Sequence, residues 1–467
     1  MERVLTMQSI EKLIPQKKVH FIGIGGIGMS ALAQLLISRG IQVSGSDINR
    51  SPITQRLEVQ GAKIFLNHKP ANVADADIVV YSSCIAKDNP EIIQAQKKKI
   101  RLLKRAQLLA SLMKEKYGIA ITGTHGKTTT TALISVLLET ACLYPSFAVG
   151  ADVNILGGNA KLGSGKYFVA EADESDGSFL ALEPNCAVIT NIDREHLDYY
   201  KDLKHIIATY AQFTKKIRKG GVLFCWGQDK NIRKAISGYR GKLITYGLEE
   251  NCDIYARDIT CQGMMSEFRC FYKHKFIGTF KLNIPGLHNV LNSLAGIGVG
   301  LQLGLDKKII KQSLFKFSGA NRRFQLKNKG GRIIIIDDYA HHPTEIIATL
   351  KAAKAWANKR VVGVFQPHRY SRTKFLKKEF GQCFDYADHV VITDIYAASE
   401  TPIKGIAART IYEQVKKNGH QDVHLLSKAK VSKHIINNLR DGDLLMMLGA
   451  GDIGTLTDEL VKQLSTR

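Results

Sequence analysis

Short apolar runs alternate with longer stretches of helical periodicity near the N-terminus. VHFIGI (19–24) predicts a buried strand, SALAQLLISRG (30–40) a helix, and IQVSGSD (41–47) the next strand. ADIVVYSS (76–83) predicts a further strand, and RAQLLASLMKEK (105–116) predicts a helix. Strands that alternate with helices in this way are typical of βαβ units, so the pattern favours a parallel sheet.

The same alternation starts again twice. YGIAIT (117–122) predicts a strand before a Gly/Thr loop and a helix, and GRIIIIDDYA (331–340) begins a third set. Between them, the pattern from about 241 to 282 favours short antiparallel strands. We therefore expect an α/β chain with three domains in series: a Rossmann-like domain at 1–110, a central domain at 111–320 and a Rossmann-like domain at 321–467.

The composition is that of a globular chain with a strong positive charge. Of 467 residues, 45% are hydrophobic and 23% are charged, which is the ordinary globular range. The net charge of +24 attracts anions, which leaves nucleic acid, a membrane surface and phosphorylated metabolites open. Apolar runs fall short of the ~18 residues of a membrane span. Charges near the N-terminus exclude a secretory signal, so we expect a cytoplasmic protein without stable membrane insertion.

The eight cysteines are spread through the chain and form no CxxC pair. In a chain of this length such spacing favours reduced thiols over a disulfide scaffold or a zinc knuckle.

A glycine motif follows the first predicted strand. Gly23, Gly25 and Gly28 have GxGxxG spacing, Gly26 adds a further glycine, and Asp47 ends the second predicted strand. Glycines there allow backbone amides to approach a pyrophosphate, and the carboxylate can bond a ribose or a base. Alone, the motif suggests NAD or FAD, and a tight turn without a ligand is the alternative.

A second glycine loop follows the strand at 117–122. It resembles a Walker A loop but is shorter, because Ile121 stands where the first glycine would be. Loop amides cradle phosphates, the lysine neutralises phosphate charge, and the threonine hydroxyl can join a Mg²⁺ shell. The loop indicates a P-loop ATPase domain that binds ATP through Gly123, Thr124, His125, Gly126, Lys127, Thr128 and Thr129.

Acidic and histidine-bearing segments follow the next two predicted strands. EADESD (171–176) places four carboxylates within six residues, beginning at Glu171. Such a cluster favours Mg²⁺ with ATP phosphates, and a solvated acidic turn is the alternative. His196 in NIDREHLD (191–198) is a candidate ligand of a second metal ion, although a lone histidine is more often a satisfied loop residue.

The C-terminal third carries two polar segments after predicted strands. DDYAHHP (337–343) includes His341 and His342, and QPHRYSR (366–372) includes two arginines three positions apart. Paired guanidinium groups can hold a carboxylate or phosphate, and a surface basic turn is the alternative. A zinc site at the histidine pair lacks support, because no further ligand spacing accompanies it.

Taken together, these motifs resemble the Mur ligase family, the ATP-dependent amide-forming enzymes of peptidoglycan precursor synthesis. The resemblance covers nearly the whole chain, and its motifs appear in family order: GTHGKTTTT, EADESDGSF, TNIDREHLD, GLHNVLN, NRRFQ, DDYAHHPTE and FQPHRYSRT. GIGGIGMSALA, and HHPTE with FQPHRYSRT, are most similar to the branch that joins L-alanine to UDP-N-acetylmuramate through an acyl phosphate. The murein tripeptide ligase of cell-wall recycling is the alternative.

The resemblance implies a role for each motif. UDP-N-acetylmuramate is expected at Gly23, Gly25, Gly26, Gly28, Asp47, Ser82, Asn159 and Ser178. ATP is expected at the loop that contains Lys127 and at Asn289, Asn292, Arg323 and Asp338. Mg²⁺ is expected at Thr128, Glu171 and His196. The muramyl carboxylate and L-alanine are expected at His368, Arg369 and Arg372. Catalytic roles are expected for Lys127, His196, His341 and His342.

The resemblance also implies one departure. Several family members bridge Mg²⁺ with a carbamylated lysine, but here that position is Tyr210, so we expect no carbamate. We expect a monomer or weak homodimer.

Two other classes explain less. An NAD-dependent oxidoreductase leaves GTHGKT and EADESD unexplained. A nucleic-acid-binding ATPase needs a basic stripe with interleaved aromatic residues, but the lysine runs are short and scattered, so no nucleic acid is expected.

Overall fold

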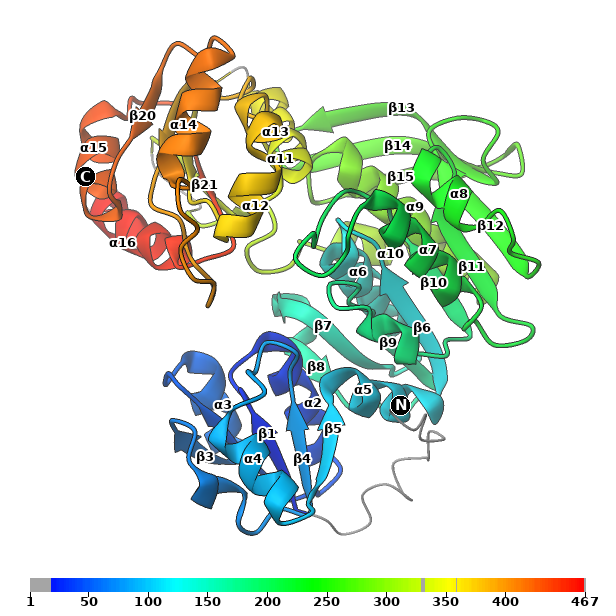
Figure 1. Cartoon of the computed structure of the whole chain (residues 1–467). Helices are drawn as coiled ribbons and strands as arrows, with labels where there is room; N and C mark the ends of the chain where they lie inside the picture. The colour runs from blue at the N-terminus through cyan, green and yellow to red at the C-terminus, as the bar shows by residue number, and fades with distance from the viewer. Residues whose placement is uncertain (1–17, 329–331, 358, 466–467) are drawn as a thin grey trace. The chain divides into compact units, whose positions relative to one another are not determined.

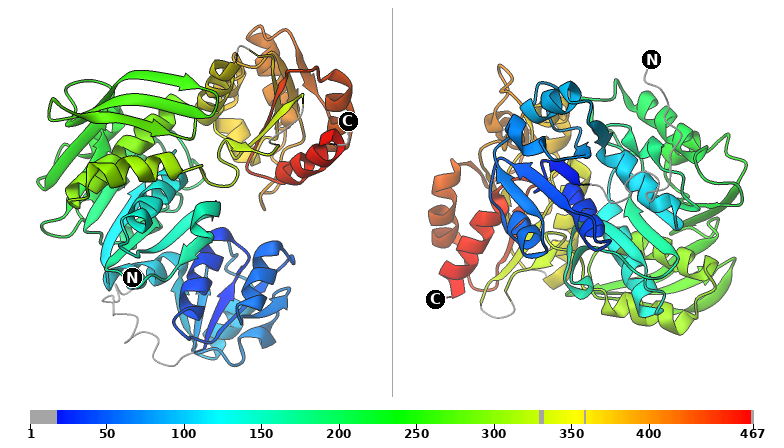
Figure 2. Two further views of the ribbon diagram at one scale, coloured as in Figure 1. Left: turned by 180° about the vertical axis from the view of Figure 1, so that it is seen from behind. Right: turned by 90° about the horizontal axis from the view of Figure 1, so that it is seen from below.

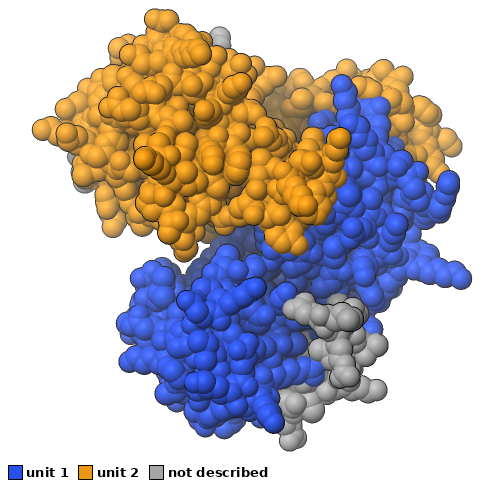
Figure 3. Space-filling model, viewed as in Figure 1, with its two compact units in different colours: residues 1–192, 206–246, 295–310 blue, residues 193–205, 247–294, 311–467 orange. Residues whose placement is uncertain are grey.

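The computed structural model describes residues 18–328, 332–357 and 359–465, which form an α/β protein with three sheets along the chain (Figure 1). The expected α/β class, with parallel-sheet Rossmann-like domains in series, is confirmed. The exact domain boundaries stay a prediction. By its internal contacts the chain divides into two compact units, coloured in Figure 3. Unit 1 comprises residues 1–192, 206–246 and 295–310, and unit 2 comprises residues 193–205, 247–294 and 311–467.

The first sheet, in unit 1, is parallel throughout and has the order β3-β2-β1-β4-β5. Because β1 lies between β2 and β4, the glycine loop after β1 opens where the strand order reverses, and α/β proteins bind ligands at such points. The strands are β1 (Val19–Ile22), β2 (Val43–Asp47), β3 (Lys63–Leu66), β4 (Ile78–Tyr81) and β5 (Arg101–Lys104). The helices are α2 (Ile27–Ile37), α3 (Pro52–Val59), η1 (Pro70–Val73), α4 (Pro90–Lys97) and α5 (Arg105–Lys114).

The central strands of unit 1 have the order β12-β11-β10-β6-β9-β7-β8. Of the six pairs that these strands form with one another, only β7 with β8 is antiparallel. The strands are β6 (Tyr117–Thr122), β7 (Ser146–Val153), β8 (Gly158–Lys161), β9 (Tyr167–Glu171), β10 (Cys186–Ile189), β11 (Val222–Trp226) and β12 (Lys242–Gly247). The helices are α6 (Lys127–Thr140), η2 (Asn154–Leu156), η3 (Ser178–Ala181), α7 (Leu203–Thr214) and α8 (Lys230–Ala235).

The antiparallel stretch predicted for 241–282 is confirmed only in part. In unit 2, β13 (Ile254–Gln262), β14 (Met265–Tyr272) and β15 (Lys275–Leu282) form antiparallel pairs. The prediction is wrong for β12, which pairs in parallel with β11. Helix α8 supplies the crossover that a parallel pair requires. The chain then forms α9 (Leu287–Gln302) and α10 (Lys307–Lys316).

The third sheet, in unit 2, has the order β16-β17-β21-β18-β19-β20, and β16 is its antiparallel edge. Helices cover both faces of this sheet, with α14 on one face and α15 and α16 on the other (Figures 1 and 2). Alternate residues of β19 face opposite cores, because Val391 shares one core with Val431 of α15 and Val390 shares the other with Ile411 of α14. The strands are β16 (Gln325–Leu326), β17 (Ile334–Asp338), β18 (Val361–Phe365), β19 (His389–Ile392), β20 (Val423–Leu425) and β21 (Leu444–Leu448). The helices are α11 (Pro343–Ala357), α12 (Tyr370–Phe375), α13 (Lys377–Gly381), α14 (Ala408–Lys417), α15 (Lys428–Asn438) and α16 (Ile453–Ser465).

No helix in the described part of the chain has the length and apolar character needed to span a bilayer. All eight cysteines are free, as expected from their spacing. Cys84 and Cys142 are exposed, Cys261 is half-buried, and the other five are buried.

Close packing between β1 and β2 generates a prediction about Gly45. It lies beside Phe21 in the parallel register, and a Cβ there would be 2.5 Å from Ile24 Cδ1 and 2.8 Å from Phe21 O. Because backbone cannot yield easily, Gly45→Ala should lower the free energy of unfolding by about 1–3 kcal/mol. Urea unfolding would measure this. Gly238→Ala is the matched control, since its new methyl group would meet no atom within 4 Å. Equal midpoints for the two variants would contradict the prediction.

Candidate active site

The loop between β6 and α6 in unit 1 has a backbone that only glycine fits at two positions. Gly123 and Gly126 have φ angles of +132° and +82°, and a side chain at Gly123 would clash with Thr190 Oγ1. Thr190 Oγ1 donates to His125 O (2.6 Å). Asn191 accepts from His125 N (2.8 Å) and donates to His125 O (2.9 Å). The segment after β10 therefore fixes a loop at the N-terminus of α6, a position that favours anions.

Lys127 lies folded against this loop. Its Nζ donates to Gly123 O (2.6 Å), Thr124 O (3.1 Å) and Glu174 Oε1 (2.9 Å). Burial opposes its charge, but the carboxylates of Glu174 and Asp173 hold the pKa of Lys127 above its usual value. The loop therefore presents a charged ammonium group beside its glycines.

Protein cations and amides already satisfy much of the acidic segment after β9. Asp173 pairs with Arg105 (3.0 Å), and Glu174 pairs with Lys127 (2.9 Å). Glu171 Oε1 accepts from Gly150 N at 2.5 Å. A Cβ at Gly150 would lie 2.7 Å from the same carboxylate, so glycine is needed there. Local partners therefore offset part of the repulsion among these carboxylates, and the binding of Mg²⁺ by Glu171 stays a prediction.

The glycine loop after β1 is held by its own acidic residue. Gly23 has a φ angle of +77°. Asp47 Oδ2 accepts from Gly25 N (2.9 Å), and a Cβ at Gly25 would lie 2.8 Å from that oxygen. Asp47 Oδ1 accepts from Asn49 N (3.3 Å). Gly26 is the N-cap of α2. Asp47 thus shapes the loop, and its contact with a nucleoside stays a prediction.

Asn159 of β8 is fully buried against the start of α2. Its Nδ2 donates to Ile27 O (3.0 Å), and its Oδ1 accepts from Gln34 Nε2 and Arg56 Nη2, both at 3.3 Å. Arg56 also pairs with Asp152 of β7 (3.0 Å). These bonds join the first sheet's helices to β7 and β8 within unit 1. A sugar-nucleotide contact by Asn159 stays a prediction.

Three further residues predicted to bind substrate, Ser82, Ser178 and Gly28, also lie in unit 1. Ser82 Oγ accepts from Cys84 N (3.3 Å) in the turn after β4. Ile85 in the same turn reaches the glycine loop, because its Cδ1 would lie 3.2 Å from a Cβ at Gly23. Ser178 N donates to Asp176 Oδ1 (3.0 Å) at the start of η3. A Cβ at Gly28 would lie 3.1 Å from Arg105 Nη1.

In unit 2, a buried ion pair joins the segment after Asp193 to α12. Arg372 Nε donates to Glu195 Oε1 (3.0 Å), and Arg372 Nη1 donates to His368 Nδ1 (2.8 Å) and His368 O (2.9 Å). A guanidinium group has no acceptor, so His368 carries its proton on Nε2. Burial opposes the charge of Glu195, but Arg372 and then His342 hold the pKa of Glu195 well below its usual value.

Arg369 lies beside this pair in a strained conformation. Its φ angle is +72°, and its Nη1 donates to Asp198 Oδ2 (3.1 Å). Ser371 Oγ donates to Glu400 Oε1 at 2.5 Å. A small pocket of unit 2 lies here, and its lining includes Arg194, Glu195, His196, Asp198, Arg369, Ser371 and Arg372. The two arginines thus bond protein carboxylates here, and their contact with substrate carboxylates stays a prediction.

Hydrogen bonds fix the tautomers of the two adjacent histidines. His341 Nδ1 donates to Tyr339 O (2.9 Å), which leaves its Nε2 as an acceptor. His342 Nδ1 accepts from Thr344 N (3.3 Å), and its Nε2 donates to Arg194 O (3.3 Å). Burial and then Arg372 lower the pKa of His341 to about 3. His341 is therefore neutral near pH 7, with an unprotonated nitrogen.

His368 and His196 complete this group. Burial and then Arg372 lower the pKa of His368 to about 2. Its ring stacks on Tyr396 with centroids 5.7 Å apart. His196 has a φ angle of +55°, and its N donates to Glu195 Oε1 (3.2 Å). The structure therefore brings His196, His341, His342, His368 and Arg372 around one carboxylate, Glu195.

Asp338 at the end of β17 organises the segment that carries Arg323. Its two oxygens accept from Phe324 N and Ala340 N, both at 2.7 Å, and burial raises the pKa of Asp338 to about 6. The Arg323 guanidinium lies 5.1 Å from the centroid of the Tyr339 ring. The predicted nucleotide residues Asp338 and Arg323 are thus neighbours within unit 2.

The asparagines predicted to bind ATP lie on one face of α9. Asn289 Nδ2 donates to Pro285 O (2.7 Å), and Asn292 Nδ2 donates to Asn289 Oδ1 (3.3 Å). Both side chains are buried. Tyr210 of α7, at the position of the bridging lysine, is buried and packs edge-on against Phe179, with centroids 5.2 Å apart.

Sequence reasoning did not assign a role to several residues that shape these sites. Thr190 and Asn191 hold the phosphate loop, Glu195 is the hub of the histidine group, and Arg322 fixes the third domain's arginine segment. Arg322 donates to Gly449 O (2.6 Å) and Gly451 O (3.1 Å). The signal was present in the motif TNIDREHLD and in the doubled arginine of NRRFQ.

These features define a class of phosphate-binding α/β enzymes. Members of this class have parallel sheets with a glycine loop, a charged lysine in that loop, and acidic and histidine residues at strand ends. Comparison with known proteins narrows this class. The chain matches the Mur ligase family, catalytic domain, at residues 18–117, the Mur ligase middle domain at 121–300, and the Mur ligase, glutamate ligase domain at 322–451. The chain belongs to the Mur ligase family.

Two curated relatives are both called UDP-N-acetylmuramate–L-alanine ligase. That from Geotalea daltonii is 45% identical over 96% of this chain and 98% of its own length. That from Desulfotalea psychrophila is 46% identical over 96% of this chain and 98% of its own length.

Solved structures agree in fold. The UDP-N-acetylmuramate–alanine ligase of Thermotoga maritima has a TM-score of 0.84 and 30% identity, covering 96% of this chain and 99% of its own. The murein peptide ligase of Psychrobacter arcticus has a TM-score of 0.73 and 24% identity, covering 97% and 99%.

The depressed pKa of Glu195 predicts how stability depends on pH. The carboxylate is stabilised in the folded state, so its contribution is present above its ordinary pKa of 4.5 and is lost as the pH falls below that value. Glu195→Gln should therefore be less stable than wild type near neutral pH, with the difference shrinking below pH 4.5. Unfolding at a series of pH values would measure this.

Glu379→Gln is the control for this series, because Glu379 forms an exposed ion pair with Arg194 (3.6 Å). It should stay close to wild type throughout. A constant difference between Glu195→Gln and wild type across the acid range would contradict the prediction.

Proposed function

We propose that this protein joins L-alanine to the carboxylate of UDP-N-acetylmuramate with the cleavage of ATP, in peptidoglycan precursor synthesis. The observation that carries the proposal is the match to relatives named for this reaction, 45% identical over 96% of the chain. The phosphate loop with its charged Lys127 supplies the ATP-binding chemistry that the reaction needs.

The murein tripeptide ligase of cell-wall recycling is the second candidate. It is less favoured, because two solved murein peptide ligases are 24% and 25% identical to this chain, whereas the alanine ligase of Thermotoga maritima is 30% identical.

The reaction needs an activated carboxylate. A carboxylate oxygen leaves poorly, so transfer of the terminal phosphoryl group of ATP to it forms an acyl phosphate. The amine of L-alanine attacks the carbonyl carbon, the tetrahedral intermediate collapses, and phosphate leaves with the former carboxylate oxygen. Both reactants are anionic, so cationic groups that offset the accumulated charge accelerate the first step.

Residues of unit 1 serve the nucleotides in this proposal. Lys127 neutralises charge on the ATP phosphates, and the loop amides cradle them. Thr128 and Glu171 would hold Mg²⁺, because a hydroxyl and a carboxylate at one sheet edge are the hard oxygen donors that this ion prefers. When bound, Mg²⁺ supplies charge neutralisation at the phosphates. The loop at Gly25 approaches the diphosphate of the sugar nucleotide.

Residues of unit 2 serve the acceptor chemistry. Neutral His341 has an unprotonated Nε2, so it can accept a hydrogen bond from the amine of L-alanine and orient it. His342 is fixed as a donor at Nε2. Arg369 and Arg372 position carboxylates, and Arg372 also holds His368 in its tautomer. ATP would be bound by Asn289, Asn292, Arg323 and Asp338. His196 would bind a second Mg²⁺.

The test is an ADP-release assay with UDP-N-acetylmuramate, Mg²⁺ and a panel of amino acids and peptides. ADP formation should require the sugar nucleotide, L-alanine and Mg²⁺ together. The sugar nucleotide supplies the carboxylate, L-alanine supplies the amine, and Mg²⁺ neutralises phosphate charge. Equal ADP release without the sugar nucleotide would refute the ligase. Turnover with the tripeptide but not with L-alanine would assign the protein to the recycling branch.

Lys127→Ala should lower turnover on the order of a hundredfold or more, because the phosphates lose their charge partner. UDP-N-acetylmuramate affinity, measured by calorimetry, should stay near wild type, because the glycine loop after β1 is a separate element. Lys161→Ala is the matched control, since Lys161 forms an exposed pair with Glu139 (2.9 Å). Circular dichroism would establish that Lys127→Ala folds, because the substitution removes the ion pair between Lys127 and the buried Glu174. A lost sugar-nucleotide affinity in the folded variant would contradict the separate roles.

A further inference from the structure

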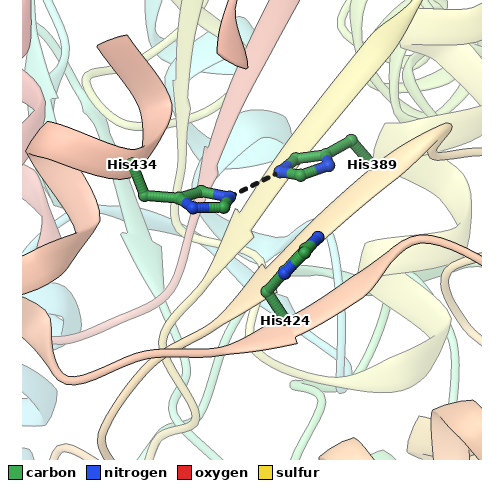
Figure 4. Close-up of side chains that lie close together, drawn as sticks. All are labelled: His389, His424 and His434. Atoms are coloured by element: carbon green, nitrogen blue, oxygen red, sulfur yellow. Dashed lines mark hydrogen bonds between the residues drawn. The ribbon is translucent and has the colours of Figure 1, made fainter. Parts of the chain in front are cut away.

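Three histidines meet in the C-terminal sheet of unit 2, outside the residues assigned above. One nitrogen of each of His389, His424 and His434 lies within 4.8 Å of one nitrogen of each other ring (Figure 4). The Nε2 atoms of His389 and His434 are 3.1 Å apart. The ring centroids are 4.8–5.2 Å from one another. We refer to these residues as the histidine cluster.

The strand register explains why the cluster forms. Val390 pairs with Val423 and Val391 with His424, so Asp422 lies opposite His389 on neighbouring parallel strands. Side chains two apart share a face, which places His389, Asp422 and His424 on one face of the sheet. Helix α15 packs on that face through Val431 and Ile435. His434 therefore comes from the covering helix to meet two histidines of the sheet.

A carboxylate orients two of the three rings. Asp422 Oδ2 accepts from His389 Nδ1, and Asp422 Oδ1 accepts from His424 Nε2, both at 2.8 Å. Because its Nδ1 carries the proton, His389 presents an unprotonated Nε2 to the centre of the cluster. That nitrogen accepts the hydrogen bond from His434 Nε2. His424 likewise keeps an unprotonated Nδ1.

These contacts have the form of a metal site with its outer carboxylate already in place. Histidines that bind metal ions commonly donate their other ring N–H to a carboxylate, which fixes tautomer and orientation. Two ligands on a zinc ion with Zn–N bonds of about 2.0–2.1 Å lie about 3.3 Å apart in a tetrahedral arrangement, close to the 3.1 Å between His389 and His434. His389 is buried, whereas the His424 side chain is 41% exposed, so an ion could enter from solvent.

We propose that His389, His424 and His434 form a binding site for a divalent transition-metal ion such as Zn²⁺, with Asp422 as the carboxylate that orients two of the ligands. Three imidazoles suit Zn²⁺, Cu²⁺, Ni²⁺ and Co²⁺, and exclude Mg²⁺, which prefers oxygen. Binding moves the His434 Nε2 proton to its Nδ1 through solvent, so the three neutral rings take the ion without net proton release.

The position of the cluster indicates a structural role. His389 is the first residue of β19, whereas the candidate active-site residues Asp338 and His368 end or follow their strands. His389 therefore lies at the amino ends of the parallel strands, whereas Asp338 and His368 lie at their carboxyl ends. A metal ion here would join β19, the edge strand β20 and α15. An ion that binds the folded state alone stabilises it, so occupancy should raise the unfolding temperature.

The experiment uses the full chain after chelator treatment and dialysis, with Zn²⁺ added in a calorimeter and Co²⁺ added in a spectrophotometer. Wild type should bind Zn²⁺ with a rise in unfolding temperature, and Co²⁺ should give the visible absorption of a tetrahedral site. His434→Asn should bind one equivalent fewer and lose both the thermal shift and the absorption. Asp422→Asn should keep the site but weaken it about 10–100-fold.

His420→Asn is the matched control, because His420 lies in the same domain and bonds Ala387 O (2.9 Å) outside the cluster. It should bind Zn²⁺ as wild type does. Zinc bound elsewhere in the protein would be retained in both His434→Asn and His420→Asn, so the difference between them isolates the cluster. Equal stoichiometry in wild type and folded His434→Asn, or a wild type that binds no Zn²⁺, would overturn the proposal. Circular dichroism of the zinc-free variants would establish that each is folded.

Discussion

Parallel strands align their carboxyl ends at one edge of a sheet, and that constraint determines where chemistry can occur in this chain. The first backbone amides of a helix have no partner within that helix, so the loops that lead from a strand into a helix can bind anions or be held by side chains. At β1 the amide of Gly25 is held by Asp47, and at β6 the loop is held by Thr190 and Asn191. The same geometry places Asp338 and His368 at the ends of β17 and β18.

The electrostatic arrangement at these edges differs between the two units. In unit 1, Glu174 and Asp173 keep Lys127 charged, which suits binding of a polyphosphate. In unit 2, burial and then Arg372 keep His341 and His368 neutral, which leaves Nε2 of His341 able to accept a hydrogen bond from an amine. A chain with a net charge of +24 therefore obtains a charged lysine and neutral histidines from local partners, and the total charge predicts neither.

The features that could be predicted from the sequence are those that depend on residues close together in the chain. The glycine loops, the strand-helix alternation and the strand-end motifs depend on short-range backbone chemistry, so their positions could be inferred directly. The parallel pairing of β12 could not, because the short runs near Lys242 have the same alternation in either direction. The bond of Arg372 to Glu195 spans 177 positions, and no local pattern records such a partner. The histidine cluster likewise depends on the register of β19 with β20.

The turn after β4 has a practical consequence for observing the protein. Cys84 is exposed, bonds Ser82 through its backbone, and is followed by Ile85, which reaches Gly23 of the first glycine loop. Of the other seven thiols, five are buried, which slows their reaction with alkylating reagents. With Cys142 replaced by serine, a maleimide fluorophore would attach chiefly at Cys84. Its emission would then show, in real time, whether an added ligand changes the surroundings of the first glycine loop.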